Sequence, residues 1–328
     1  MSVHRDDPNL IRFALHGGAG ELPADAGPQD EQRRALHDIA AEAVAMLQAG
    51  GSAVDAVSLA VERLEQCPLF NAGIGAVLNR DGLPELDAAI ARGEDRGTGA
   101  VAGVSRVGSP IQLARAVMER SPHVLFSADG AEALARQLGL PMVDPQSFII
   151  PLRLEQLAAA KRSGSIALDH VDAAAAAPDA AFGTVGAVAR DRRGHLAAAT
   201  STGGLTNKLP GRIGDTAVFG AGTFADDSSC ALSCTGTGES FIRAAFGQAV
   251  HGRMRWGGMS LADACQAALD DVRQLGGVGG CIAIDRDGTI CLPFNSGVLF
   301  RAWWSADGGA ISTAVWRDAA MPQTAPVP

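Results

Sequence analysis

The sequence lacks the features that mark several broad classes of protein. It contains no run of about 18 apolar residues, the length that a membrane-spanning helix needs. Its net charge is -9, and no Lys/Arg cluster is longer than a pair of arginines. Both observations argue against a nucleic-acid partner and against binding to a membrane surface. The six cysteines show no paired CxxC spacing of the kind that zinc sites use, so we expect buried, reduced thiols.

Common catalytic motifs are also absent. The chain has no GxSxG elbow, no GxxxxGK[ST] phosphate loop and no HExxH, and its seven histidines are scattered without ligand spacing. We therefore expect no cofactor for catalysis. The amino terminus is polar and carries acids, without the apolar core of a signal peptide, so we expect a cytoplasmic protein.

Apolar periodicity predicts a large folded core of mixed strands and helices. The 328 residues, 47% of them hydrophobic, are compatible with one domain or two. Their order predicts a layered α/β/β/α sandwich rather than a barrel. The predicted strands are residues 11–15, 85–90, 99–104, 184–189, 195–200, 231–235, 280–285 and 289–293, with a hairpin turn at 191–194. The predicted helices are residues 29–48, 53–65, 111–119, 129–138, 239–252 and 261–275.

Residues 153–183 differ in composition from the rest of the chain. They begin with a polar stretch and continue into an almost pure alanine run at 172–181. We interpret this segment as a flexible linker. A helix over the alanine run is the alternative, although Pro178 would shorten it.

Threonine stands next to glycine at three predicted strand ends, at Gly183-Thr184, Thr202-Gly203 and Thr235-Gly236. Glycine leaves room for a ligand against the backbone and frees amide N–H groups to point at it. The simpler interpretation is that threonine suits strands and glycine suits turns. Three such pairs, the first at the end of a linker, favour a functional site.

Thr184 has the surroundings of a nucleophile that is released by chain cleavage. A threonine hydroxyl needs a base beside it, and these motifs offer no histidine. Cleavage before Thr184 would create an α-amine with a pKa of about 7.7 to 8.0, which suits proton transfer near neutral pH. Gly183 has no side chain to obstruct attack on its carbonyl. One residue would then supply both nucleophile and base.

Two further segments have the chemistry of substrate recognition. The guanidinium of Arg212 can hold a carboxylate and Asp215 a protonated amine, which together match the head group of an amino acid. A local surface salt bridge is the alternative. The segment CTGTGE (residues 234–239) ends a predicted strand and opens a helix, so its N–H groups can stabilise an oxyanion, or it is a simple strand-to-helix turn.

Taken together, these motifs resemble the isoaspartyl peptidase/plant-type asparaginase family of threonine-type N-terminal-nucleophile (Ntn) hydrolases. The similarity follows the family's order over nearly the whole chain. The matching segments are LHGGAG (15–20), NAGIGAV (71–77), ELDA (85–88), GTVGAVA (183–189), TSTGGLTNK (200–208), GRIGD (211–215) and CTGTGE (234–239). The resemblance implies a four-layer αββα sandwich of the Ntn type with mixed or antiparallel central sheets. It also implies one domain made of an α subunit, residues 1–183, and a β subunit, residues 184–328.

The resemblance assigns roles to individual residues. Thr184 would be the nucleophile, freed by cleavage of the Gly183–Thr184 bond, with Thr202 bonded to it and Asn71 supporting it. Arg212 and Asp215 would hold the substrate's α-carboxylate and α-amine. Thr235 and Gly236 would form the oxyanion and substrate contacts, with Gly238 nearby. In relatives, loop carbonyls bind a structural sodium ion, which here would involve Leu64, Glu65, Phe70, Ala72 and Ile74.

The implied substrates are L-asparagine and β-aspartyl dipeptides, hydrolysed through a covalent ester on Thr184 by a dimer of cleaved α/β pairs. Residues 294–298 lack an acid that we expect near that point in close relatives, and the chain has no tyrosine, so the preferred leaving group stays open. A glycosylasparaginase is one alternative. A non-cleaving amino-acid-binding protein is another.

Overall fold

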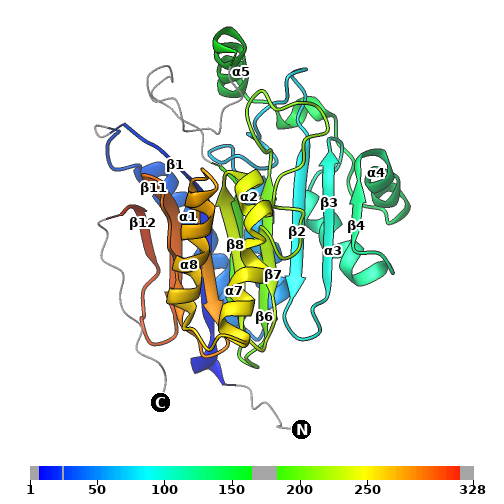
Figure 1. Cartoon of the computed structure of the whole chain (residues 1–328). Coiled ribbons are helices and arrows are strands. Elements are labelled where there is room, and N and C mark those ends of the chain that lie inside the picture. The colour runs from blue at the N-terminus through cyan, green and yellow to red at the C-terminus, as the bar shows by residue number, and fades with distance from the viewer. Residues whose placement is uncertain (1–6, 24–25, 165–182, 318–328) are drawn as a thin grey trace.

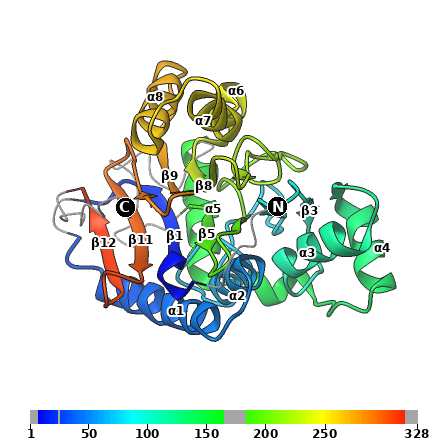
Figure 2. The same cartoon turned by 90° about the horizontal axis from the view of Figure 1, so that it is seen from below.

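Two stacked β-sheets form the centre of the molecule. The computed structural model describes residues 7–23, 26–164 and 183–317. An eight-stranded and a four-stranded sheet lie between helices on either side (Figures 1 and 2). This confirms the mixed α/β class that the sequence predicts. Every strand pair in both sheets is antiparallel except β3 with β4.

The strand order places segments from both halves of the chain side by side. Across the large sheet the strands are β12 (Ser312–Trp316), β11 (Val298–Ser305), β1 (Arg12–Gly20), β5 (Val185–Arg190), β6 (Leu196–Thr202), β2 (Leu86–Arg92), β3 (Thr98–Val104) and β4 (Leu125–Ser127). Across the small sheet they are β10 (Ile290–Cys291), β9 (Gly279–Asp285), β8 (Cys230–Gly236) and β7 (Thr223–Ala225).

The helices are interspersed among the strands along the chain. They are α1 (Asp30–Gln48), α2 (Ala53–Glu65), α3 (Pro110–Arg120), α4 (Ala128–Gln137), α5 (Pro151–Ser163), α6 (Gly238–Ala244), α7 (Phe246–Arg255) and α8 (Leu261–Gln274), with short 3-10 turns η1 (Pro8–Leu10) and η2 (Pro145–Phe148). None of those in the described ranges combines the length and the apolarity that crossing a bilayer requires.

The three largest apolar clusters hold these elements together. The first joins α1, α2 and α3 to one face of the large sheet, the second joins α7 and α8 to the small sheet, and the third lies between the two sheets. In β5, Val185 and Ala187 belong to the first cluster and Val188 to the third. Such strands are buried on both faces, which explains why they read as continuous apolar runs in the sequence.

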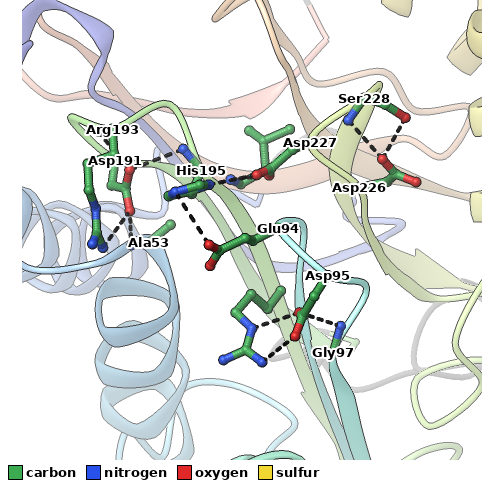
Figure 3. Close-up of polar contacts among 12 residues, drawn as sticks. Ala53, Glu94, Asp95, Gly97, Asp191, Arg193, His195, Asp226, Asp227 and Ser228 are labelled. Atoms are coloured by element: carbon green, nitrogen blue, oxygen red, sulfur yellow. Dashed lines mark hydrogen bonds and ion pairs between the residues drawn. The ribbon is translucent and has the colours of Figure 1, made fainter. Parts of the chain in front are cut away.

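The turn between β5 and β6 confirms the predicted hairpin. Asp191 is buried and accepts the N–H groups of Arg193 at 2.9 Å and His195 at 3.1 Å (Figure 3). Its other oxygen accepts the Ala53 N–H at 3.2 Å, at the first turn of α2. One carboxylate therefore shapes the hairpin and satisfies a free amide at a helix start.

The predicted linker over residues 153–183 is wrong for its first part. Residues up to Ser163 form helix α5. Its first residue is Pro151, at a position that favours proline, and its C-cap is Gly164, whose φ of +68° suits glycine. Leu157 and Ala160 of α5 are buried, so packing outweighs the polar composition. The alanine run, residues 172–181, lies outside the described residues.

The predicted helix over residues 239–252 is also wrong as one piece. It breaks at Ala245, which has a left-handed φ of 46° and separates α6 from α7. The break lets Phe241 and Phe246 both enter the second apolar cluster, with ring centroids 5.1 Å apart.

The sequence prediction missed β4, β7, β11 and β12. All six cysteines are free, and four are buried, while Cys67 and Cys291 are partly exposed.

Candidate active site

The three threonine-glycine pairs meet where the two sheets face each other. Thr184 directly precedes β5, Thr202 ends β6, and Thr235 lies near the end of β8. β5 and β6 pair with Val185 opposite Ser201, which brings Thr184 beside Thr202. The structure thus gathers residues that lie 18 to 51 positions apart in the chain.

The Thr184 hydroxyl is fixed by a neighbouring threonine. Its Oγ1 donates to Thr202 Oγ1 at 3.1 Å, and Thr202 Oγ1 also accepts the Gly204 N–H at 2.9 Å. Both threonines are buried, at 8% and 2% exposure. Because Thr202 accepts the Thr184 O–H, it sets the direction of that bond and therefore of the two lone pairs on Thr184 Oγ1.

The Gly183 backbone lies in a tight space beside Thr235. A Cβ on Gly183 would lie 3.2 Å from Thr235 Oγ1, and a Cβ on Gly18 would lie 2.6 Å from the Gly183 carbonyl oxygen. The Thr235 hydroxyl is itself held by the Ala19 N–H at 3.1 Å. Glycine is therefore needed at position 18, since a side chain there would push the two backbones apart, whereas a side chain at position 183 would require a small shift of Thr235.

Asn71 supports the loop that carries Thr202. Its Nδ2 donates to the Gly204 carbonyl at 2.9 Å, and its Oδ1 accepts the Val77 N–H at 2.9 Å. The Gly203 N–H donates to the Asn71 carbonyl oxygen at 3.1 Å. Asn71 is fully buried, so these bonds are shielded from water. It acts on Thr184 through Thr202 and Gly204.

The predicted strand-to-helix turn follows Thr235. β8 ends at Gly236, whose φ of +144° favours glycine, and α6 begins at Gly238. The Thr237 N–H is already bonded to the Val278 carbonyl at 2.9 Å. The Thr237 N–H is therefore not free to hold an oxyanion.

Gly238 lies between the two predicted head-group residues. A Cβ on Gly238 would lie 2.9 Å from Asp215 Oδ1 and 3.0 Å from Arg212 Nη2. Three of the five residues that the sequence analysis assigns to substrate binding thus converge on one spot. A glycine keeps that spot open.

Asp215 has the properties of a receptor for a cation. It is 4% exposed, and among the described residues its Oδ2 has no hydrogen-bond partner. Burial raises its pKa to about 6, against the opposing pull of Arg212. An unpaired buried carboxylate oxygen is costly unless a ligand satisfies it, and an ammonium group would do so.

Arg212 is paired with a residue that the sequence interpretation did not consider. Its Nε and Nη2 donate to the two carboxylate oxygens of Glu239, each at 2.8 Å. The salt bridge that we weighed as the alternative for Arg212 thus involves Glu239. The Nη1 group lies on the other side, 2.9 Å from where a Gly214 Cβ would be. Glu239 occupies one edge of the guanidinium and leaves Nη1 for a second carboxylate.

Sequence reasoning also missed two buried charges, Asp87 and Lys208, which are 0% and 1% exposed. Both belong to segments quoted for the family resemblance, yet no role was assigned to them. For Asp87, a charged residue inside an otherwise apolar strand was the available signal.

The proposed sodium loop is built around carbonyl groups. The Glu65 carbonyl accepts the Ile74 N–H at 2.7 Å. A Cβ on Gly75 would lie 2.6 Å from the Pro68 carbonyl oxygen and 3.1 Å from that of Phe70, so these oxygens converge where glycine leaves space. Such oxygens fit a hard cation. Within the described ranges, no three His, Cys, Asp or Glu side chains are grouped to hold a metal.

Comparisons with known proteins agree on one family. A family model described as asparaginase matches residues 9–313. An isoaspartyl peptidase of Salmonella typhimurium is 50% identical over 94% of this chain and all of its own length, and one of Escherichia coli is 50% identical over 93% of this chain and 96% of its own. A probable isoaspartyl peptidase/L-asparaginase 2 of Arabidopsis thaliana is 39% identical over 93% of this chain and 98% of its own length.

Proposed function

We propose that this chain, which belongs to the asparaginase family, is an autoprocessing amidohydrolase that cleaves β-aspartyl dipeptides and L-asparagine. The observation that carries the proposal is the buried Thr184–Thr202 hydroxyl pair next to the Gly183 backbone. It supports the proposal because the hydroxyl that would act as nucleophile, the hydroxyl that would orient it and the peptide bond that would be cut all belong to this group of residues.

Processing begins when Thr184 Oγ1 attacks the carbonyl carbon of Gly183. The C–N bond breaks as the hydroxyl proton passes to the Thr184 nitrogen, leaving a Gly183 ester on Oγ1 and a free α-amine. Water then hydrolyses the ester. The products are a Gly183 carboxylate and a free hydroxyl on an amino-terminal Thr184.

Substrate hydrolysis uses the same hydroxyl. The head group binds with its α-carboxylate on Arg212 and its α-ammonium on Asp215, so that the β-amide reaches Thr184. The Thr184 amine accepts the hydroxyl proton as Oγ1 attacks the β-carbonyl, and the oxyanion forms beside Thr235 and Gly236. The proton passes to the leaving nitrogen, ammonia or an amine departs, and water hydrolyses the β-aspartyl ester.

The head-group site accounts for the substrate class. One carboxylate receptor and one ammonium receptor flank Gly238, and both L-asparagine and β-aspartyl dipeptides present this pair of charges. The leaving group lies on the far side of the β-amide, away from these residues. Recognition therefore depends on the aspartyl part, and different amines are accepted as leaving groups.

The same family membership supports the larger organisation. We infer a four-layer αββα sandwich of the Ntn type, with an α subunit of residues 1–183 and a β subunit of residues 184–328 in one domain. We infer a dimer of such cleaved pairs, located in the cytoplasm. Sodium would brace the loop on either side of Asn71 and take no part in the reaction. The carbonyls that would hold it are those of Leu64, Glu65, Phe70, Ala72 and Ile74.

Mass spectrometry of the purified protein tests the proposal. We expect two fragments, the second beginning at Thr184, and hydrolysis of L-asparagine and of a β-aspartyl dipeptide. Thr184→Ala should remain one chain and inactive. A single intact chain that binds L-aspartate without hydrolysis would favour the amino-acid-binding alternative. Preferential hydrolysis of glycosylated asparagine would favour a glycosylasparaginase.

A further inference from the structure

Asp87 lies directly beside the threonine pair. It is the second residue of β2, and in the sheet it stands opposite Thr202 of β6. Side chains of directly opposed residues in an antiparallel pair share one face. The buried carboxylate of Asp87 is therefore on the residue directly across from Thr202, which accepts the Thr184 hydrogen bond.

The Asp87 carboxylate also reaches the substrate-recognition segment, residues 211–215. Its Oδ1 accepts the Gly103 N–H at 2.8 Å, and its Oδ2 lies 3.4 Å from the Gly214 N–H, a long bond. Gly214 directly precedes Asp215 and lies close to Arg212 Nη1. Asp87 thus links the strand beside Thr202 to the turn that carries the head-group receptor.

Lys208 is connected to the same segment through Glu85. Its Nζ donates to the Glu85 carbonyl at 2.7 Å and lies 4.0 Å from the Glu85 carboxylate. That carboxylate accepts the Gly211 N–H at 3.0 Å, so the recognition segment is held at both its first residue and Gly214. Lys208 Nζ also lies 3.0 Å from where a Gly204 Cβ would be.

The two buried charges depend on each other. Burial raises the pKa of Asp87 and lowers that of Lys208, and in each case the opposite charge of the partner counteracts the effect. Removing one charge leaves the other buried with less compensation, which is more costly than removing both.

We propose that Asp87 and Lys208 are positioning residues that hold the recognition segment at a fixed distance from the Thr184–Thr202 pair. Neither residue touches the reacting atoms. The inference rests on the proposed function, because it concerns where the aspartyl head group sits relative to Thr184. A role in general stability alone would lower the melting temperature without changing substrate recognition.

Three variants test the inference, namely Asp87→Asn, Lys208→Met and the double variant. The measurements are KM and kcat for L-asparagine, the Kd for L-aspartate and the extent of cleavage before Thr184. We expect each single variant to raise KM and Kd at least about tenfold, since a buried charge loses its partner. Cleavage should still go to completion, because it involves no head group. The double variant should recover part of the loss.

Asp191→Asn is the matched control. Asp191 is as buried as Asp87 and also accepts backbone N–H groups, but it lies at the opposite end of β6 (Figure 3). Its substitution should lower the melting temperature and leave KM within about twofold of the unmodified protein.

The outcomes separate this inference from the proposed function. If the unmodified protein gives no fragment beginning at Thr184, the proposed function is wrong. The Kd for L-aspartate still tests the positioning role in that case. KM and Kd that stay unchanged in Asp87→Asn overturn the inference. The inference is also overturned if the fold-increase in KM of the double variant equals the product of the two single fold-increases. An equal rise in KM in Asp191→Asn overturns it as well. If the single variants do not fold, a double variant that folds and keeps normal KM and Kd also overturns it.

Discussion

The hydroxyl of Thr184 donates to the hydroxyl of Thr202 over 3.1 Å, while Thr202 receives a second hydrogen bond from Gly204 at 2.9 Å. Thr202 is thereby saturated as an acceptor, and its position is set by the loop on its carboxyl side. The bond exists before any α-amine has been released. In the proposed mechanism, Thr202 therefore orients Thr184 for chain cleavage as well as for substrate hydrolysis.

Replacing Thr202 with valine should slow both reactions. Valine keeps the shape but removes the acceptor, and losing a buried hydrogen bond of about 1.5 to 3 kcal/mol corresponds to roughly 10- to 100-fold in rate. A gel time course measures cleavage, and ammonia release measures hydrolysis. Thr202→Ser keeps the hydroxyl and should stay close to the unmodified protein. Normal cleavage in the valine variant would exclude an orienting role.

Asp215 should make substrate binding depend on pH. Its pKa is raised from 3.8 to about 6, and only the ionised form binds an ammonium group. KM for L-asparagine should therefore rise as the pH falls below about 6. Because the folded pKa exceeds the unfolded one, ionisation of Asp215 opposes folding, so this group's contribution to stability falls as the pH increases from about 4 to 6. In Asp215→Asn, the rise in KM below about pH 6 and the change in melting temperature between about pH 4 and 6 should both disappear.

Glu239 should hold Arg212 in place for the substrate. The pair is bidentate at 2.8 Å, but the Glu239 side chain is 52% exposed, so we expect only about a threefold rise in KM for Glu239→Gln. Arg212→Lys should have a larger effect, because lysine cannot form the two parallel bonds. Steady-state kinetics at fixed pH shows whether KM rises or falls. A fall in KM would mean that Glu239 competes with the substrate carboxylate.

Asn71 should affect the rate of reaction more than the binding of substrate. Asn71→Leu removes the bond to the Gly204 carbonyl and the bond from the Val77 N–H, so the loop that carries Thr202 loses its buried support. We expect kcat to fall about tenfold or more, with a smaller change in KM. A fall in kcat with an equally large rise in KM and a lower melting temperature would indicate a general folding defect instead.

The cysteines should react slowly in the native protein. Burial raises the pKa of the Cys230 thiol to about 12, and Cys234, Cys265 and Cys281 are also buried. The partly exposed Cys67 should be alkylated fastest without denaturant, because a hydrogen bond with Cys265 and burial raise the pKa of the other partly exposed thiol, Cys291. Peptide mapping after iodoacetamide treatment checks this, with a denatured sample as control in which all six are labelled. Rapid native labelling of Cys230 would contradict the buried position.

Local sequence signals predicted much of the fold. The apolar runs of β5 and β6 and the spacing of α1, α2 and α8 are visible without the structure, because periodicity reports burial directly. The helix α5 was missed because its polar residues suggest a linker, although Leu157 packs into the core. The break at Ala245 was missed because alanine favours helix, and only the burial of Phe241 and Phe246 together requires the left-handed residue.

The site was predicted to a similar extent. Threonine beside glycine pointed to Thr184 and Thr202, and the structure brings their hydroxyls into contact. The pairing of Arg212 with Glu239 could not be predicted, because the two lie 27 positions apart and meet only through the placement of α6. The same holds for Asp87, whose place beside Thr202 depends on strand register.

The sequence by itself determined which groups can react: a threonine preceded by glycine, a nearby arginine and aspartate for an amino-acid head group, and glycines where backbones approach closely. These are properties of single residues and their immediate neighbours. The tertiary structure decided which of them meet, since sheet register and helix placement set every distance between distant segments. Hence Glu239 occupies one edge of Arg212, and Asp87 lies beside Thr202.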